Sequence, residues 1–214
     1  MIITCIPGGS FMENCYIIGD EEACEAILVD PGEQVSQIRD EIKESGLKFT
    51  KIINTHTHLD HVAGVDTFKK ELGIPFYIHK EDQAVLDFLP AAVKRYPGFD
   101  FVEKPKVDGY VDENDTIEIG NLKGKILHVP GHSWGHICFV FEKHIIAGDT
   151  VFAGSVGRVD LTGGTSMEEL IGSIMQKIMV YPDDFKIYSG HGPSTTVGIE
   201  KMTNPFLQGA YVNY

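Results

Sequence analysis

The sequence has 214 residues, of which 43% are hydrophobic and 23% are charged, a composition typical of a folded globular protein rather than a disordered chain. Its formal net charge of −13, from 31 acidic and 18 basic residues, disfavours binding to nucleic acids and to anionic lipids, which carry charge of the same sign. The length suits one layered unit, so we expect a single domain over residues 1–214.

The sequence shows no sign of export or of membrane insertion. No apolar stretch reaches the ~20 residues that span a bilayer, and the N-terminus lacks a basic segment followed by an apolar run. The four cysteines, Cys5, Cys15, Cys24 and Cys138, have neither CxxC spacing nor the density of a disulfide framework. We therefore expect a cytoplasmic protein without a membrane partner. No pattern indicates an oligomeric state.

The first half of the chain predicts alternating strands and helices. Short apolar runs separated by Gly, Asp and Glu predict strands at residues 2–6, 15–18 and 26–29. Apolar residues at helical spacing then predict helices that end at Gly46 and Gly73, and a short helix at residues 80–89. Strands are expected between them, at residues 49–54 and 74–78. This alternation is typical of a layered α/β fold.

Residues 90–108 have no clear period, with prolines and Gly98 among aromatic and basic residues. Such a segment could form a loop over a pocket or a plain connector, and the sequence leaves both open. The basic residues Lys94, Arg95, Lys104 and Lys106 are expected on a solvated face.

The second half predicts a second set of strands, at residues 116–119, 125–129, 137–141, 145–147 and 185–188. Between the last two, Ser166 and Glu169 form a capping box before a helix with one apolar face. No repeat or linker divides the chain.

The segment His56-Thr57-His58-Leu59-Asp60-His61 concentrates three imidazoles and a carboxylate at the end of a predicted strand. Side chains at i and i+2 of an extended segment point the same way, so His56 and His58 can share one metal ion, while Asp60 and His61 can turn toward another. Helical HExxH spacing is absent, which sets aside that type of zinc site.

Three more candidate ligands, His132, Asp149 and His191, follow predicted strands and are flanked by small residues. Imidazole nitrogen and carboxylate oxygen are ligands that zinc favours. The set predicts two divalent metal ions, with zinc preferred and iron or manganese as alternatives.

The sequence contains an HxHxDH motif followed by a lone His, an Asp and a final His. In this order of ligands it resembles the metallo-β-lactamase-fold hydrolases, and the resemblance covers nearly the whole chain. The resemblance implies a four-layer αβ/βα sandwich, an α/β fold with two facing mixed β-sheets and helices outside. It also implies that His56, His58 and His132 bind one metal, that Asp60, His61 and His191 bind the other, and that Asp149 bridges them.

The stretches HVPGHSWGHI, GDTVFAGSVGRVDLTGG and SGHGPSTTVGIEKMTNPFL resemble the glyoxalase II-like subgroup, in a form without its C-terminal helical domain. This implies hydrolysis of a small thioester, such as an S-2-hydroxyacyl thiol, by a metal-bridging hydroxide with Asp60 and Asp149 at the reacting centre. A thiolate leaving group, whose conjugate acid has a pKa of about 8.5, needs no side-chain acid. The sequence does not identify the thiol that carries the acyl group.

Arg158 could contact substrate, because it lies in a loop after a metal ligand, or form a structural ion pair. The isolated histidines His79, His128, His136 and His144 are expected to be structural or exposed, although His128 and His136 could orient a ligand. Asp66, Asp82 and Asp160 are interpreted as solvated acids. Two other functions are weighed: a mononuclear iron persulfide dioxygenase on the same fold, and a non-catalytic binding module.

Overall fold

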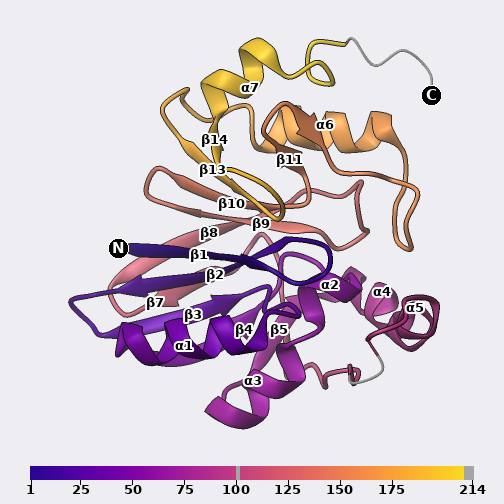
Figure 1. The fold of residues 1–214 in the computed structure, drawn as a ribbon. Coiled ribbons are helices and arrows are strands. Elements are labelled where there is room, and N and C mark those ends of the chain that lie inside the picture. Colours follow the sequence, from indigo (N-terminus) through magenta and orange to yellow (C-terminus); the bar gives the residue numbers. More distant parts are fainter. Residues whose placement is uncertain (100–101, 210–214) are drawn as a thin grey trace.

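The computed structural model describes residues 1–99 and 102–209. Two six-stranded sheets face one another, and helices cover the outer face of each, as Figure 1 shows. This is the four-layer αβ/βα sandwich with mixed sheets that the sequence predicts. None of the helices in these residues combines the length and apolarity needed to cross a membrane.

The first sheet has the strand order β1-β2-β3-β4-β5-β6. β1 to β3 pair antiparallel, and β3 to β6 pair parallel. The parallel part requires crossovers, which the helices of this half supply. Its strands are β1 (Ile2–Gly8), β2 (Glu13–Asp20), β3 (Glu25–Val29), β4 (Lys48–Ile53), β5 (Phe76–His79) and β6 (Gly109–Val111).

The second sheet has the order β14-β13-β10-β9-β8-β7 and is antiparallel except for the β10–β13 pair. Its strands are β7 (Thr116–Ile119), β8 (Leu122–His128), β9 (Ile137–Phe141), β10 (His144–Gly148), β13 (Lys186–Ser189) and β14 (Thr195–Thr196). A separate hairpin pairs β11 (Val151–Phe152) with β12 (Ser155–Val156).

The core is divided by the alternation of side chains along each strand. In β2, Tyr16 and Ile18 pack between the two sheets, whereas Cys15 and Ile17 pack under the helices. All eight residues of β2 are buried, because both faces of its sheet are covered. The sheets therefore hold three apolar clusters in successive layers, with the central one between them.

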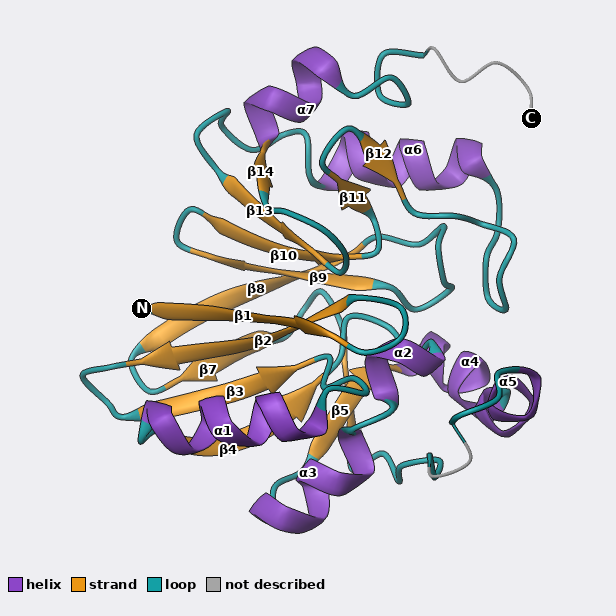
Figure 2. Cartoon of the chain, in the orientation of Figure 1, coloured by secondary structure: helices purple, strands orange, loops and turns teal. Residues whose placement is uncertain are grey.

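Helices α1 (Val35–Ser45) and α3 (Val65–Leu72) lie on the outer face of the first sheet, and α6 (Met167–Lys177) lies on that of the second, as Figure 2 shows. The predicted stops of the first two helices are confirmed, since Gly46 and Gly73 have φ values of 63° and 65°. Ser166 Oγ accepts a hydrogen bond from Glu169 N at 3.1 Å, which confirms the predicted cap of α6.

The segment after the histidine motif departs from the predicted single helix. It forms α2 (Leu59–Val62) and then α3, with Gly64 between them. Gly64 N donates to Pro31 O at 2.9 Å, and a Cβ at Gly64 would lie 2.5 Å from Gly32 O. This close contact with the turn after β3 interrupts the helix.

Residues 80–89 form a 3₁₀ turn η1 (Lys80–Asp82) and helix α4 (Gln83–Asp87), in line with the prediction. The prediction of an irregular segment from residue 90 is wrong at its start, where α5 (Leu89–Arg95) is helical. Pro90 lies in the first turn, where a missing N–H breaks no helical bond. Residues 100–101 of this segment lie outside the described residues. Helix α7 (Val197–Thr203) was not predicted.

Candidate metal centre

The seven predicted ligands come together at one edge of the sandwich, where strand ends of both sheets meet. His56 and His58 follow β4, and Asp60 and His61 lie in the short helix α2. His132 follows β8, Asp149 follows β10 and His191 follows β13. Loops from both sheets therefore contribute to one cluster.

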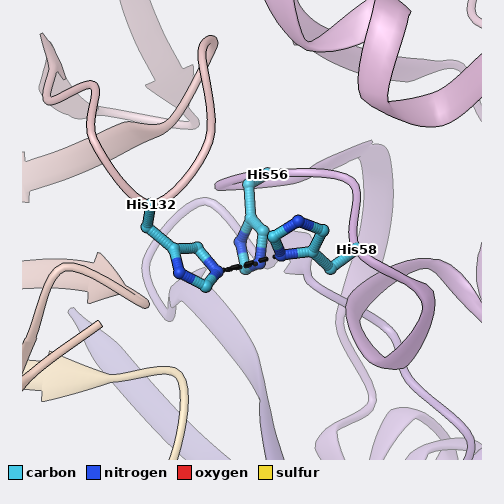
Figure 3. A group of neighbouring side chains, drawn as sticks. All are labelled: His56, His58 and His132. Atoms are coloured by element: carbon cyan, nitrogen blue, oxygen red, sulfur yellow. Dashed lines mark hydrogen bonds between the residues drawn. The ribbon is translucent and has the colours of Figure 1, made fainter. Parts of the chain in front are cut away.

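His56, His58 and His132, here called the three-imidazole group, point their nitrogens at one another (Figure 3). His132 Nε2 lies 2.9 Å from His58 Nδ1 and 3.2 Å from His56 Nε2. Three lone-pair nitrogens at such distances repel unless a proton or a cation lies between them. The arrangement fits a metal ion with three imidazole ligands.

Asp60, His61 and His191, here called the carboxylate group, lie beside the three-imidazole group. Asp60 Oδ2 is 3.3 Å from His191 Nε2 and 3.7 Å from His61 Nε2. Because one carboxylate faces two imidazole nitrogens, this group also has a donor set suited to a divalent ion.

Asp149 lies between the two groups. Its Oδ2 is 3.5 Å from His132 Nε2 and 3.4 Å from His191 Nε2, and its Oδ1 is 3.4 Å from His61 Nε2. Within the described residues, His61 Nε2 and Asp149 Oδ1 are buried without a hydrogen-bond partner. Such orphaned polar atoms are costly unless a further group satisfies them, so the cluster fits bound cations.

The far nitrogen of each imidazole donates a hydrogen bond to an oxygen, so the nitrogen inside the cluster is the one that can bind a metal ion. The acceptors are Thr55 Oγ1 for His56 (3.1 Å), Thr162 O for His58 (2.8 Å), Asp30 Oδ2 for His61 (3.1 Å), Arg158 O for His132 (2.6 Å) and Phe11 O for His191 (3.1 Å). These outer contacts orient all five rings as metal binding requires.

The two groups differ in proton affinity. Burial lowers the pKa of His56 well below its ordinary value and that of His132 to about 4. Burial also opposes protonation of His61 and His191, but the nearby carboxylates outweigh it. They raise the pKa of His61 well above its ordinary value and that of His191 to about 10. In the metal-free protein, therefore, His61 and His191 bind protons more strongly than His56 and His132 do.

Several positioning residues had no signal in the sequence. Asp30 is buried and accepts from Thr55 N and Thr55 Oγ1 at 2.7 and 2.6 Å as well as from His61, so it anchors the motif loop. Asn14 Nδ2 donates to Ser189 O and Gly192 O, both at 2.9 Å, and so brackets the loop that carries His191.

His136 and His128 were both considered as orienting residues. His136 Nε2 accepts from Asp149 N at 3.0 Å, and its ring stacks on His56 with centroids 5.0 Å apart. His136 therefore positions two of the candidate ligands. His128 has no such contact, since its Nε2 donates to Trp134 O at 2.9 Å. The prediction of Asp82 as a solvated acid is wrong, because Asp82 is buried and accepts from Gly135 N at 3.3 Å.

A cavity of about 590 Å³ opens beside the cluster. One wall comes from α4 and α5, with Val85, Phe88, Leu89 and Ala92, and another from Arg158 and neighbouring loop residues. The segment that begins at residue 90 thus borders a pocket, which agrees with the first of its two interpretations. The part that lines the pocket is a helix, however, and not a loop. Arg95, expected on a solvated face, also borders the cavity.

Arg158 forms two hydrogen bonds of 2.7 Å with Asp160, and both side chains are exposed at the cavity rim. The ion pair that the sequence analysis offered as an alternative is therefore present. It lowers the pKa of Asp160 to about 2, so this acid is ionised. The Arg158 carbonyl also accepts from His132, which links the rim to the three-imidazole group.

Two glycines are packed against the ligands. A Cβ at Gly190 would overlap Asp149 Oδ1 and lie 2.9 Å from His61 Cε1. A Cβ at Gly157 would overlap the Asp149 carbonyl oxygen and lie 3.2 Å from His132 Nδ1. Any side chain at these positions displaces a candidate ligand.

Comparisons with known proteins agree with this geometry. The family model of the metallo-beta-lactamase superfamily matches residues 8–197. A Haemophilus influenzae protein named hydroxyacylglutathione hydrolase GloC is 34% identical over 216 residues, which cover 97% of this chain and 98% of that protein.

Two solved structures are similar over almost their whole length. The BLEG-1 B3 metallo-beta-lactamase has a TM-score of 0.89 at 33% identity, covering 97% of this chain and 100% of that chain. TTHA1623 in a di-iron-bound form has a TM-score of 0.83 at 30% identity, covering 95% and 100%.

The fold and the clustered imidazoles and carboxylates define a metallo-hydrolase. The chain belongs to the metallo-beta-lactamase superfamily. This fold implies divalent metal ions, and the two groups fit them.

Proposed function

We propose that the protein is a binuclear, glyoxalase II-like thioesterase, with zinc ions held by the three-imidazole group and the carboxylate group and bridged by Asp149. The observation that carries the proposal is the convergence of seven ligand-type side chains, in which His61 Nε2 and Asp149 Oδ1 are buried without a hydrogen-bond partner among the described residues. The similarity to a protein named hydroxyacylglutathione hydrolase supports the choice of substrate class. Iron is the alternative metal that the di-iron relative favours.

Divalent ions with such ligands polarise a carbonyl oxygen and lower the pKa of water to about 7, which supplies a nucleophile near neutrality. The residues of this chain supply the charge and the fixed ligand positions for that chemistry. Asp60 and Asp149 set the negative charge at the reacting centre, and the outer hydrogen bonds hold the imidazoles in place.

A thioester suits the cavity because its leaving group departs as a thiolate without protonation. Among the described residues that line the cavity, the carboxyl outside the metal cluster is Asp160, which is ionised and paired with Arg158. A basic amine leaving group would lack an acid of suitable pKa. Arg158 lies at the cavity rim, where a positive charge attracts an anionic substrate, and we assign it to substrate binding on this ground.

The test is thioester hydrolysis by protein purified without added metal, with metal content measured by elemental analysis. S-lactoylglutathione and simple acyl thioesters serve as substrates, and the matching amides and a β-lactam serve as controls. We expect about two metal equivalents and turnover of thioesters alone. Turnover of the β-lactam alone would overturn the substrate class.

A persulfide dioxygenase would use one iron held by two histidines and one aspartate. Oxygen uptake with glutathione persulfide, one iron equivalent and no thioester turnover would therefore replace the hydrolase proposal. Activity on simple thioesters but not on S-lactoylglutathione would reject glutathione as the thiol carrier and keep the thioesterase.

A further inference from the structure

A second set of ligand-type side chains lies outside the metal centre. His79 ends β5, Glu81 lies in η1 and His128 ends β8, and one ligand atom from each lies within 4.8 Å of the others. None of the three lines the large cavity. Because β5 belongs to the first sheet and β8 to the second, this cluster joins the two sheets.

The donors in the cluster are of mixed type. The rings of His79 and His128 are stacked, with centroids 4.2 Å apart and 20° between their planes. His128 Nε2 lies 2.9 Å from Trp134 O and 3.6 Å from Glu81 Oε2. Two imidazoles, one carboxylate and one backbone carbonyl thus lie close together, and an ion that binds His128 Nε2 displaces the proton that this nitrogen donates to Trp134 O.

The local charge favours a cation. Burial and the neighbouring His128 lower the pKa of His79, so its imidazole is neutral near pH 7 and keeps a lone pair. Its Nδ1 only accepts a long hydrogen bond of 3.3 Å from Glu81 N, which a stronger ligand bond can replace. The carboxylates of Glu81, Asp82 and Asp112 add negative potential at this ring.

The cluster is accessible from solvent. A groove of about 500 Å³ beside it is lined by Glu81, His128, Pro130, Trp134, Thr165 and Glu169. The side chains of His128 and Glu81 are 24% and 61% exposed, so a hydrated ion can reach them.

We propose that His79, Glu81 and His128 bind a divalent transition-metal ion, with the Trp134 carbonyl as an adjacent oxygen donor, at a site separate from the proposed catalytic centre. Two imidazoles and a carboxylate are a donor set that zinc accepts, with water completing the shell. The stacked rings need one imidazole to turn about χ2, a soft torsion for histidine, and His128 has room beside the groove. The bound ion would connect the ends of β5 and β8 across the sandwich.

Trp134 gives a direct probe, because it is the only tryptophan in the sequence. Holoprotein freed of loosely bound metal is titrated with Cu²⁺, which binds such ligands more tightly than Zn²⁺ does, while Trp134 fluorescence is recorded. Calorimetry with Zn²⁺ counts the added ions, and elemental analysis confirms that the resident metals stay bound. We expect saturable quenching and one further equivalent.

The variants are His128→Gln and Glu81→Gln, with His144→Gln as the matched control. His144 is a partly exposed imidazole on β10 whose Nδ1 contacts Tyr188 Oη at 3.3 Å, and among residues 1–99 and 102–209 it belongs to no such cluster. We expect at least about tenfold weaker binding in the first two variants and unchanged binding in the control. The exposed Glu81 can be changed without loss of folding. Absence of the further equivalent in the unaltered protein, or unchanged affinity in His128→Gln and Glu81→Gln, would overturn the proposal.

Discussion

The two halves of the proposed metal centre are built from similar residues but differ in charge. In the three-imidazole group, burial lowers the pKa of His56 and His132, whereas the carboxylate group adds Asp60 and draws protons to His61 and His191. An ion that binds to His56 and His132 meets little competition from protons near neutrality. An ion entering the second group must displace protons but gains a negative ligand. We therefore expect conditions under which the two groups hold different amounts of metal.

The largest effect should come from the residue that both groups share. Asp149→Ala removes the carboxylate that faces His61, His132 and His191. We expect kcat/KM for a thioester to fall by more than about 100-fold, beyond the loss that outer hydrogen-bond partners cause, and metal content to fall at both groups. Activity within tenfold of the unaltered protein would contradict the bridging role.

A matched pair of variants tests metal binding by each of the two groups separately. His58 and His191 are the partly exposed histidines of their groups, so truncation to alanine should leave the core intact. We expect His58→Ala and His191→Ala each to retain about one metal equivalent by elemental analysis, with large losses of turnover. Loss of both ions in both variants would show that the groups do not bind independently.

Acidification should remove the two ions in a fixed order. The pKa of His191 is about 10 and that of His61 is raised, so protons compete for the carboxylate group throughout the neutral range, and more strongly as pH falls. The pKa of His132 is about 4 and that of His56 is lowered, so protons compete for these two ligands of the three-imidazole group only in more acidic solution. Dialysis from about pH 8 to pH 5 should therefore leave one ion, at the three-imidazole group. Release of both ions in one step would refute this order.

A smaller and selective effect is expected from Asn14→Ala. The change removes two hydrogen bonds that bracket His191 and leaves the three-imidazole group untouched. We expect metal affinity of the carboxylate group to weaken by about 10- to 100-fold. A metal titration by calorimetry measures both affinities, and chemical denaturation of the metal-free protein measures the accompanying loss of stability. Equal weakening at both groups would mean a general loss of structure instead.

Arg158→Gln should have the smallest effect. Its pair with Asp160 is exposed, so the free energy of unfolding should change by less than about 1 kcal/mol. Metal content should not change. For an anionic thioester we expect KM to rise by less than about tenfold at constant kcat, measured by steady-state kinetics, while a neutral thioester serves as the control. An equal rise for the neutral substrate would exclude charge recognition by Arg158.

The sequence predicted those parts of the site whose residues are close together or carry a repeated signal. Three imidazoles and a carboxylate between His56 and His61 are visible without a structure, and His132, Asp149 and His191 follow strands in small-residue surroundings. The strand pattern also predicted most strands of both sheets, because alternation and turn residues are local properties, whereas the arrangement as two facing sheets followed from the family resemblance.

The remaining features depend on long-range contacts. Asn14 and Ser189 are 175 residues apart in sequence, and an asparagine after a turn carries no sign of such a partner. Helix α5 was missed because Pro90 suggested irregular structure, and β11 and β12, each two residues long, are too short for a periodic pattern. Sequence periodicity reports which residues face the core, not which strand ends meet.

Gly157 and Gly190 impose a constraint on how this scaffold can diverge. Because neither position can acquire a side chain without displacing a candidate ligand, the loops on that side of the cluster have little freedom to vary. The opposite wall, with Val85 from α4, Ala92 from α5 and Phe88 between the two helices, contributes none of the seven ligands. Substitutions in that wall can reshape the cavity while the metal ligands stay fixed. We therefore expect natural relatives with different substrates to differ in α4 and α5 and to retain glycine at both constrained positions.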